Sequence, residues 1–316
     1  MKNKNTKRSR LKRVTIPPST IKVVVTGGAG FIGSNIVDAL VERGFNVHII
    51  DNLSEGRREN VNKKATLHIA DVCSLESIKK VFKDVQYVFH CAALPRVQYS
   101  IEHPQETNEV NIGGTINVLE ACRWAGVKKL IYSASSSVYG DQPTMPLVES
   151  MTAMPKSPYG LQKYVGEIYC KTWSEVYRVP TVSLRYFNVY GLRQSSEGAY
   201  ALVIPSFLKQ RQVGKPMTIV GDGKQTRDFT HVRDVVRANI LAMESDKVGK
   251  GEVINIGAGN NVSINKIAEL IGGPVEHISG RLEPKHTLAD NALAKKLLDW
   301  KPTVNIEDGI RELLET

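Results

Sequence analysis

Short runs of β-branched and other apolar residues alternate with longer segments in which apolar residues recur at helical spacing. The short runs predict buried strands over residues 21–26, 47–51, 66–69, 87–91 and 129–133. The longer segments predict a helix over residues 31–43, ended by Gly44, and a long helix over 104–125. Strands that alternate with helices imply right-handed crossovers, so the pattern predicts an α/β fold with a doubly wound parallel sheet.

The pattern changes after residue 180, where strands predicted over 217–220 and 253–256 are separated by loops rich in Gly, Asp and Arg. This change predicts a smaller C-terminal domain laid across the carboxyl edge of the sheet. We expect the large unit over residues 21–180 and the smaller, mainly substrate-binding unit over 181–316. The boundary is not expected to be clean, because part of the second half returns to the first sheet.

Composition narrows the class of protein. With 41% hydrophobic and 23% charged residues, the 316-residue chain is typical of a globular enzyme, and no apolar run reaches the ~18 residues that a membrane span needs. Four cysteines are scattered, without a CxxC pair or a metal-ligand cluster. We therefore expect free thiols in a reducing cytoplasm, and no metal.

The net charge of +10 is concentrated at the N-terminus. Seven basic residues and no acidic one precede residue 21: Lys2, Lys4, Lys7, Arg8, Arg10, Lys12 and Arg13. Removing these seven charges from the net charge of +10 leaves +3 for the rest. Residues 1–20 are thus expected to be a flexible basic tail, and the folded part shows no pattern typical of nucleic-acid binding.

A glycine-rich turn directly follows the first predicted strand and leads into a helix. Its residues are Gly27, Gly30, Phe31, Ile32 and Gly33, in a GxxGxxG spacing. Such a turn lets the backbone approach a pyrophosphate at a helix N-terminus. Asp51 ends the second strand 18 residues after Gly33, close to the ~20 expected for a ribose-binding carboxylate. This context predicts a Rossmann-type domain, and the carboxylate favours NAD over NADP because it repels a 2′-phosphate.

Tyr159 and Lys163 stand four residues apart, on one face of a predicted helix. A free tyrosine has a pKa near ~10, and a neighbouring ammonium and a positive nicotinamide ring both favour the phenolate. Ser135 follows a strand 24 residues before Tyr159, at the sheet edge where open α/β folds bind ligands. Tyr159 is therefore a candidate general base, and Ser135 and Lys163 are candidates for residues that assist it.

With these motifs, the sequence resembles the extended short-chain dehydrogenase/reductase family and, within it, the UDP-glucose 4-epimerase group. The resemblance runs from Ile21 to the C-terminus, through VTGGAGFIGS, IIDNLS, ADV, FHCAALPRV, RYFNVYG, GDGKQTRDFTHVRD and KHTLAD. It implies that Tyr159 takes the proton of the sugar 4-hydroxyl while C4 passes hydride to NAD⁺. Ser135 is implied to bond the same oxygen and Lys163 the nicotinamide ribose, and the 4-keto sugar then turns and accepts the hydride on its other face.

The resemblance also implies two sets of contacts. The cofactor-binding set adds Asn52, Asp71, Val72, Ala92, Ala93, Asn111, Ser133, Tyr186 and Val189 to the glycine-rich turn, Asp51, Tyr159 and Lys163. The substrate-binding set is Arg96, Ser135, Ser136, Ser137, Tyr159, Asn188, Val203, Arg227, Arg281 and Thr287. Asn188, Arg227 and Arg281 are the implied anchors of the nucleotide diphosphate, although an ion pair of Arg227 with Asp222 or Asp228 is an alternative.

The two residues after Ser135 separate the reactions within the family. Dehydratases and decarboxylases carry acidic residues there, and epimerases that invert C3 and C5 carry a cysteine. Ser136 and Ser137 are hydroxyls, so the resemblance implies epimerisation at C4. UDP-hexoses, their N-acetylated forms and UDP-glucuronate stay open as substrates, as do a net oxidoreductase that releases NADH and a silent NAD-binding regulator.

Two further expectations rest on the resemblance. The helices over 104–125 and 157–177 resemble those of a four-helix dimer interface, so we expect a homodimer, although Val110, Ile116, Leu119, Ile168 and Trp173 could instead face their own sheet. Thr287 occupies a position in the wall beside the sugar 2-substituent, where relatives restricted to glucose and galactose can carry tyrosine. The small threonine predicts room for an acetamido group.

Overall fold

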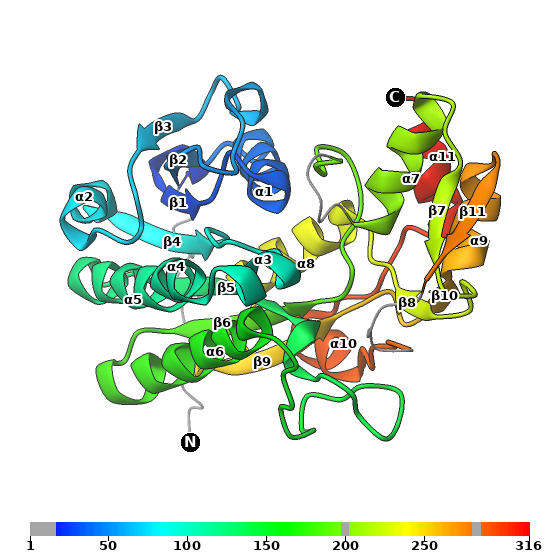
Figure 1. Ribbon diagram of the computed structural model, residues 1–316. Coiled ribbons are helices and arrows are strands. Elements are labelled where there is room, and N and C mark those ends of the chain that lie inside the picture. Colours follow the sequence, from blue (N-terminus) through cyan, green and yellow to red (C-terminus); the bar gives the residue numbers. More distant parts are fainter. Residues whose placement is uncertain (1–16, 197–201, 280–285) are drawn as a thin grey trace, which may run out of the picture.

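The protein is built on a parallel sheet of seven strands (Figure 1). The structure, a computed structural model, describes residues 17–196, 202–279 and 286–316. The strand order is β3-β2-β1-β4-β5-β6-β9. Their bounds are β1 Lys22–Thr26, β2 Asn46–Asp51, β3 Thr66–Ile69, β4 Val85–His90, β5 Lys129–Ser135, β6 Thr181–Tyr186 and β9 Glu252–Ile256. The predicted α/β fold with a doubly wound parallel sheet is confirmed.

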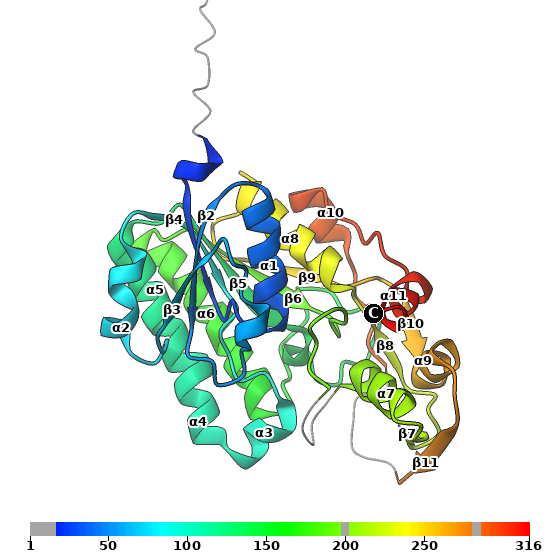
Figure 2. The same cartoon turned by 90° about the horizontal axis from the view of Figure 1, so that it is seen from above.

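Helices cover both faces of this sheet (Figure 2). One face carries α1 Phe31–Glu42, α8 Val232–Glu244 and α10 Ala292–Leu298, and the other carries α2 Leu75–Lys79, α5 Gly114–Ala125 and α6 Pro158–Tyr177. Strand residues alternate between the two cores: Val23 and Val25 pack towards α1, whereas Val24 packs towards α5. A strand buried on both faces needs a continuous apolar run, which is why β1 reads KVVVT.

A smaller lobe lies beyond the carboxyl edge of the sheet (Figure 1). It contains α7 Val203–Gln212, α9 Ile264–Ile271, α11 Ile306–Leu314 and two short two-stranded sheets. Strand β7 Met217–Val220 pairs in parallel with β11 Val275–Ile278, and β8 Thr226–Asp228 pairs antiparallel with β10 Asn261–Ser263. The lobe has its own apolar core, in which Phe207, Ile219 and Ile267 are fully covered.

One detail differs from the sequence-based expectations. The long helix over 104–125 is interrupted: α4 Pro104–Asn108 passes through a π-helical segment, η4 Glu109–Gly113, into α5. The strands β6 and β9 both follow residue 180 and belong to the seven-stranded sheet, which is a return of the chain of the kind that the sequence led us to expect. The division into two units at residue 180 stays a prediction.

Within the residues that the structure describes, five short elements remain, before and between the strands and helices given above. They are η1 Pro18–Thr20, η2 Arg58–Asn60, η3 Lys80–Phe82, α3 Val97–Glu102 and η5 Ser136–Val138. Over the part of the chain that the structure describes, no helix is long and apolar enough to cross a membrane. Residues 1–16 of the expected basic tail lie outside the described residues.

Candidate active site

The glycine-rich turn brings α1 against the end of β1. Gly27 has a φ of +67°, and a Cβ there would lie 2.7 Å from the backbone nitrogen of Ala92. A Cβ on Gly33 would collide with the carbonyl oxygen of Gly27. Gly30 precedes the helix, so Phe31 and Ile32 open its first turn with free N–H groups. The turn is therefore a close backbone approach of the kind that a pyrophosphate needs.

Asp51 is held at the end of β2 by two backbone groups. Its Oδ2 accepts from the N–H of Ala29 at 2.9 Å and its Oδ1 from the N–H of Leu53 at 2.8 Å. A Cβ on Gly56 would lie 2.6 Å from Oδ1, so the loop after the strand closes around the carboxylate. Each carboxylate oxygen keeps a second lone pair for a ribose hydroxyl. These residues fit the dinucleotide that the sequence predicts.

Other predicted cofactor contacts lie at the neighbouring strand ends. Asn52 donates to Asp71 Oδ2 at 3.0 Å, so these two polar residues are in contact, with Val72 next to them in the chain. Arg57 is exposed, with its guanidinium 3.9 Å from Glu59. The first half of the predicted cofactor set thus gathers along the ends of β1, β2 and β3.

A directional chain of hydrogen bonds supports the loop after β4, which contains Ala92 and Ala93. Thr115 donates to the carbonyl of Asn111 at 2.7 Å, so it accepts from Nε2 of His90 at 3.0 Å. The Nδ1 atom of His90 then accepts from Thr26 at 2.7 Å, and Thr26 accepts from the N–H of Ala92 at 3.3 Å. Burial lowers the pKa of His90 to about 3, which keeps its ring neutral.

Asn111 lies in the π-helical segment and joins three elements. Its side chain exchanges hydrogen bonds with the backbone of Leu94, at 2.8 and 3.1 Å. Its Nδ2 also donates to Gln162 at 2.8 Å, one residue before Lys163 on α6. Single π-helical turns are frequent at functional sites, because they place a side chain that a regular helix could not present.

The three candidate catalytic residues meet at the carboxyl edge of the sheet. Ser135 ends β5, and α6 carries Tyr159 and Lys163. The N–H and the hydroxyl of Ser137 both donate to Ser135 Oγ, at 3.2 and 2.9 Å. Ser135 therefore has its own proton free to donate elsewhere, and its hydrogen bond to Tyr159 favours the phenolate.

Burial dominates the protonation of this centre. It raises the pKa of Tyr159 to about 12, against the opposing hydrogen bond of Ser135, and lowers the pKa of Lys163 to about 8. The Nζ atom of Lys163 donates to the carbonyl of Ser133 at 2.9 Å and lies 6.0 Å from the centre of the Tyr159 ring. Ser133 in turn contacts the hydroxyl of Tyr186 at 3.2 Å.

The predicted substrate contacts come from several loops. Asn188 donates weakly to the carbonyl of Asp228 and to Thr287 Oγ1, at 3.3 and 3.4 Å, and Arg227 donates to the carbonyl of Thr226 at 3.0 Å. Arg96 is paired with Glu55 at 3.0 Å. Two other predicted substrate contacts begin helices: Val203 is the first residue of α7 and Ser136 the first of η5. Arg281 lies outside the described residues. Val189, a predicted cofactor contact, is buried after the end of β6.

Residues with structural roles around the site escaped the sequence-based reasoning. Ser100 Oγ accepts from the N–H of Tyr159 at 3.0 Å, and Glu167 forms a buried ion pair with Arg185 one turn after Lys163. Asp228 accepts three backbone N–H groups from distant segments. Of these residues, only Glu167 could have been found from its local sequence, because it follows Lys163 by four residues and so lies on the same face of the helix. Within the described ranges, no group of three or more His, Cys, Asp or Glu residues could hold a metal ion.

A glycine-rich turn, a carboxylate at the end of β2 and a Ser–Tyr–Lys group define an NAD-dependent protein of the extended short-chain dehydrogenase/reductase class. Within that class, residues 23–257 match the NAD dependent epimerase/dehydratase family. The chain belongs to this family, as the sequence-based resemblance predicted, and NAD is the family's cofactor.

Three similar proteins are informative. A putative UDP-glucose 4-epimerase of Methanocaldococcus jannaschii is 38% identical over 300 residues, which cover 92% of this chain and 97% of that protein. The structure of a UDP-N-acetylglucosamine 4-epimerase from Methanobrevibacter ruminantium in complex with UDP-N-acetylmuramic acid is 41% identical, with a TM-score of 0.89 and coverages of 93% and 97%. A UDP-glucuronic acid 4-epimerase from Bacillus cereus, solved with UDP-glucuronic acid and NAD, is 33% identical, with a TM-score of 0.85 and coverages of 93% and 98%.

Proposed function

We propose that this protein is an NAD-dependent 4-epimerase of UDP-hexoses that interconverts UDP-glucose with UDP-galactose and UDP-N-acetylglucosamine with UDP-N-acetylgalactosamine. The observation that carries the proposal is the grouping of Ser135, Tyr159 and Lys163 beside a turn that holds the hydroxyls of Ser136 and Ser137. No carboxyl group follows Ser135 there to eliminate water or assist decarboxylation. The named activities of the similar proteins support the reaction type.

NAD, when bound, supplies the chemistry that removes hydride from C4 of the sugar and returns it. The residues of this chain move the proton: Tyr159 takes it from the 4-hydroxyl, while Ser135 donates a hydrogen bond to the same oxygen. Ser137 keeps Ser135 oriented, because both of its donors point to Ser135 Oγ. Lys163 binds the nicotinamide ribose, and the hydrogen bond of Ser135 opposes the burial that raises the pKa of Tyr159 to about 12.

Asn188 and Arg227 are the proposed anchors of the nucleotide diphosphate, because an amide and a guanidinium can both donate to phosphate oxygens. A sugar held by its diphosphate can turn and present either face of C4 to the same cofactor. Thr287 leaves room for a 2-acetamido group beside the sugar. Its hydroxyl also accepts from the N–H of Asp228 at 3.2 Å, so a structural role exists alongside the steric one.

UDP-glucuronate is the second candidate substrate, because the Bacillus cereus relative was solved with it. Its carboxylate needs donors, and the hydroxyl of Ser136 lies at the turn beside Ser135, whereas that of Ser137 already donates to Ser135 Oγ. The two candidates differ in the group at C6 and share the reaction at C4.

The test is direct incubation of the purified protein with UDP-glucose, UDP-N-acetylglucosamine and UDP-glucuronate, with products resolved by NMR. We expect the C4 epimers of the first two, with no net release of NADH. Conversion of UDP-glucuronate alone would favour the second candidate, and stoichiometric NADH release would exclude an epimerase.

A further inference from the structure

Asp228 connects three segments that lie far apart in the sequence. It ends β8, and its side chain is fully buried. Its Oδ1 accepts from the N–H of Ala258 at 2.6 Å, and its Oδ2 accepts from the N–H groups of Gly259 and Ala289 at 3.0 and 2.9 Å. One carboxylate thus fastens β8 to the loop after β9 and to the segment that follows residue 286.

The packing around this carboxylate leaves no spare room. A Cβ on Gly257 would lie 2.9 Å from Asp228 Oδ2 and would collide with the Cβ of Ala289. Asn291 donates to the carbonyl of Gly257 at 2.7 Å and so ties the same two segments together. Because every neighbour is backbone or a short side chain, the three segments cannot shift independently.

The proposed substrate contacts surround this clamp. The backbone N–H of Asp228 donates to Thr287 Oγ1 at 3.2 Å, and its carbonyl accepts from Asn188 at 3.3 Å. Arg227 is the preceding residue on β8. The carboxylate itself is fully buried and accepts the backbone N–H groups of Ala258, Gly259 and Ala289. It can therefore act on a ligand only through the residues that it holds in place.

We propose that Asp228 is a positioning residue for the nucleotide sugar: by clamping β8 to the segments at 258–259 and 289, it sets the relative positions of Asn188, Arg227 and Thr287. This inference deepens the proposed function and rests on it. The glycine-rich turn and Asp51 belong to the ends of β1 and β2, so we expect NAD to stay bound when the clamp is lost. Loss of the clamp is therefore expected to weaken the affinity for UDP and UDP-sugars and to leave the chemical step largely intact.

The test compares Asp228→Asn with the unchanged protein at pH 8. An asparagine keeps the shape but turns one acceptor into a donor that faces backbone N–H groups. Since losing a hydrogen bond to a charged phosphate weakens binding roughly 10- to 100-fold, we expect the Kd for UDP and the KM for UDP-glucose to rise about 10- to 100-fold. The kcat at saturating substrate should change less than about threefold, and the amount of bound NAD should not change.

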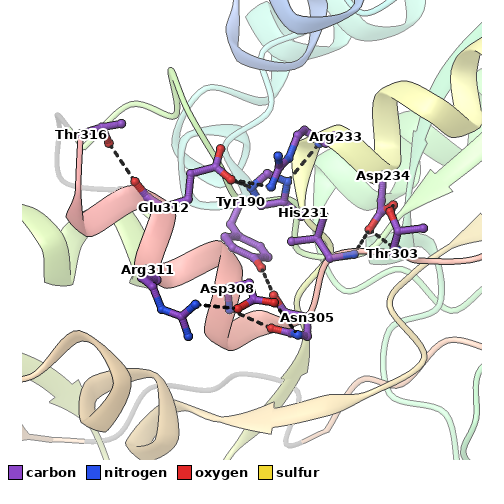
Figure 3. A network of polar contacts seen from close by, with 11 residues as sticks. Tyr190, His231, Arg233, Asp234, Thr303, Asn305, Asp308, Arg311, Glu312 and Thr316 are labelled. Atoms are coloured by element: carbon purple, nitrogen blue, oxygen red, sulfur yellow. Dashed lines mark hydrogen bonds and ion pairs between the residues drawn. The ribbon is translucent and has the colours of Figure 1, made fainter.

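Asp234 provides a matched control (Figure 3). It is also a buried carboxylate that accepts backbone N–H groups, from Thr303 at 3.0 and 2.9 Å and from Val304 at 3.0 Å, but it holds the segment before α11. Asp234→Asn should lower the thermal stability as Asp228→Asn does, with the Kd for UDP unchanged. A second variant, Gly257→Ala, keeps the carboxylate and displaces it sterically, and should repeat the rise in KM.

The outcomes separate the two proposals. If the unchanged protein neither binds UDP nor epimerises UDP-sugars, the proposed function fails. If it does both, but Asp228→Asn and Gly257→Ala bind UDP as tightly as Asp234→Asn does, Asp228 is merely structural and the inference is overturned. Should Asp228→Asn not fold, Gly257→Ala alone decides between these results, by the same Kd measurement.

Discussion

Removing one partner of the buried ion pair beneath the catalytic helix should sharply destabilise the protein. Glu167 lies on α6 and Arg185 on β6, with side-chain exposures of 1% and 5%. The pair is bidentate: Nε donates to Oε1 at 2.9 Å and Nη2 to Oε2 at 2.7 Å. The guanidinium also stacks over the ring of Tyr139, with Cζ 4.6 Å from its centre. In Glu167→Gln the guanidinium would stay buried without the carboxylate that pairs with it.

The expected magnitude follows from this burial. Breaking a buried pair by removing one partner costs about 3–5 kcal/mol, whereas replacing both partners by apolar residues of similar volume is often neutral. We expect Glu167→Gln to lower the free energy of unfolding by at least about 3 kcal/mol, measured by equilibrium unfolding in urea. The double variant Glu167→Leu/Arg185→Met should lose less than the single one.

Two results would refute this reasoning. A loss below about 1 kcal/mol for Glu167→Gln would mean that the pair is screened like one on the surface. A double variant whose loss equals the sum of the two single losses would mean that the residues do not interact. In either case the ion pair would not explain how α6 is fixed on β6.

Four further predictions concern activity and assembly. Tyr159→Phe should keep its fold and bound NAD and lose about 10²- to 10⁴-fold in kcat, as general base catalysis is worth that much; near-normal turnover would exclude the mechanism. Ser137→Ala should lower kcat about 5- to 10-fold, the value of one hydrogen bond to Ser135; an unchanged kcat would show that Ser135 needs no orientation. Thr287→Tyr should abolish turnover of UDP-N-acetylglucosamine and spare UDP-glucose, with Thr287→Ser, which keeps the hydroxyl, as the control; equal loss on both sugars would point to the structural role. Light scattering should give a dimer, because apolar residues such as Ile168, 47% exposed, lie on the outer side of α6; a monomer at micromolar concentration would count against it.

Local chemistry made much of the site predictable from sequence. Gly27, Gly33 and Asp51 act through a turn and a strand end that are close in the chain, and the i, i+4 spacing of Tyr159 and Lys163 follows from helix geometry alone. The expected dimer interface could not be predicted from neighbouring residues in the same way. Leu119 and Trp173 are buried in the core beside their own sheet, which was the stated alternative to an interface role. The pattern of apolar side chains could not distinguish a dimer interface from the protein core, because both environments bury the same types of residue.

Contacts between segments that are distant in the chain could not be predicted from the sequence. Asp228 and Ala289 are 61 residues apart, and no periodicity in either segment indicates that they meet. The π-helical segment around Asn111 was missed because its apolar spacing still reads as one continuous helix. These features depend on how distant segments pack against each other, which a single sequence encodes only through the whole fold.

The place of β9 at the edge of the main sheet has a consequence for biosynthesis. β6, whose residues are all buried, pairs on that side with a strand that begins at Glu252. At ~5–20 residues per second, a ribosome needs roughly 3–13 s to make the stretch of roughly 65 residues that separates these two strands. During this interval the nascent chain exposes an unpaired edge that would pair readily with other polypeptides. The main sheet is thus completed late in translation, and a fragment that stops before residue 252 would lack its last strand.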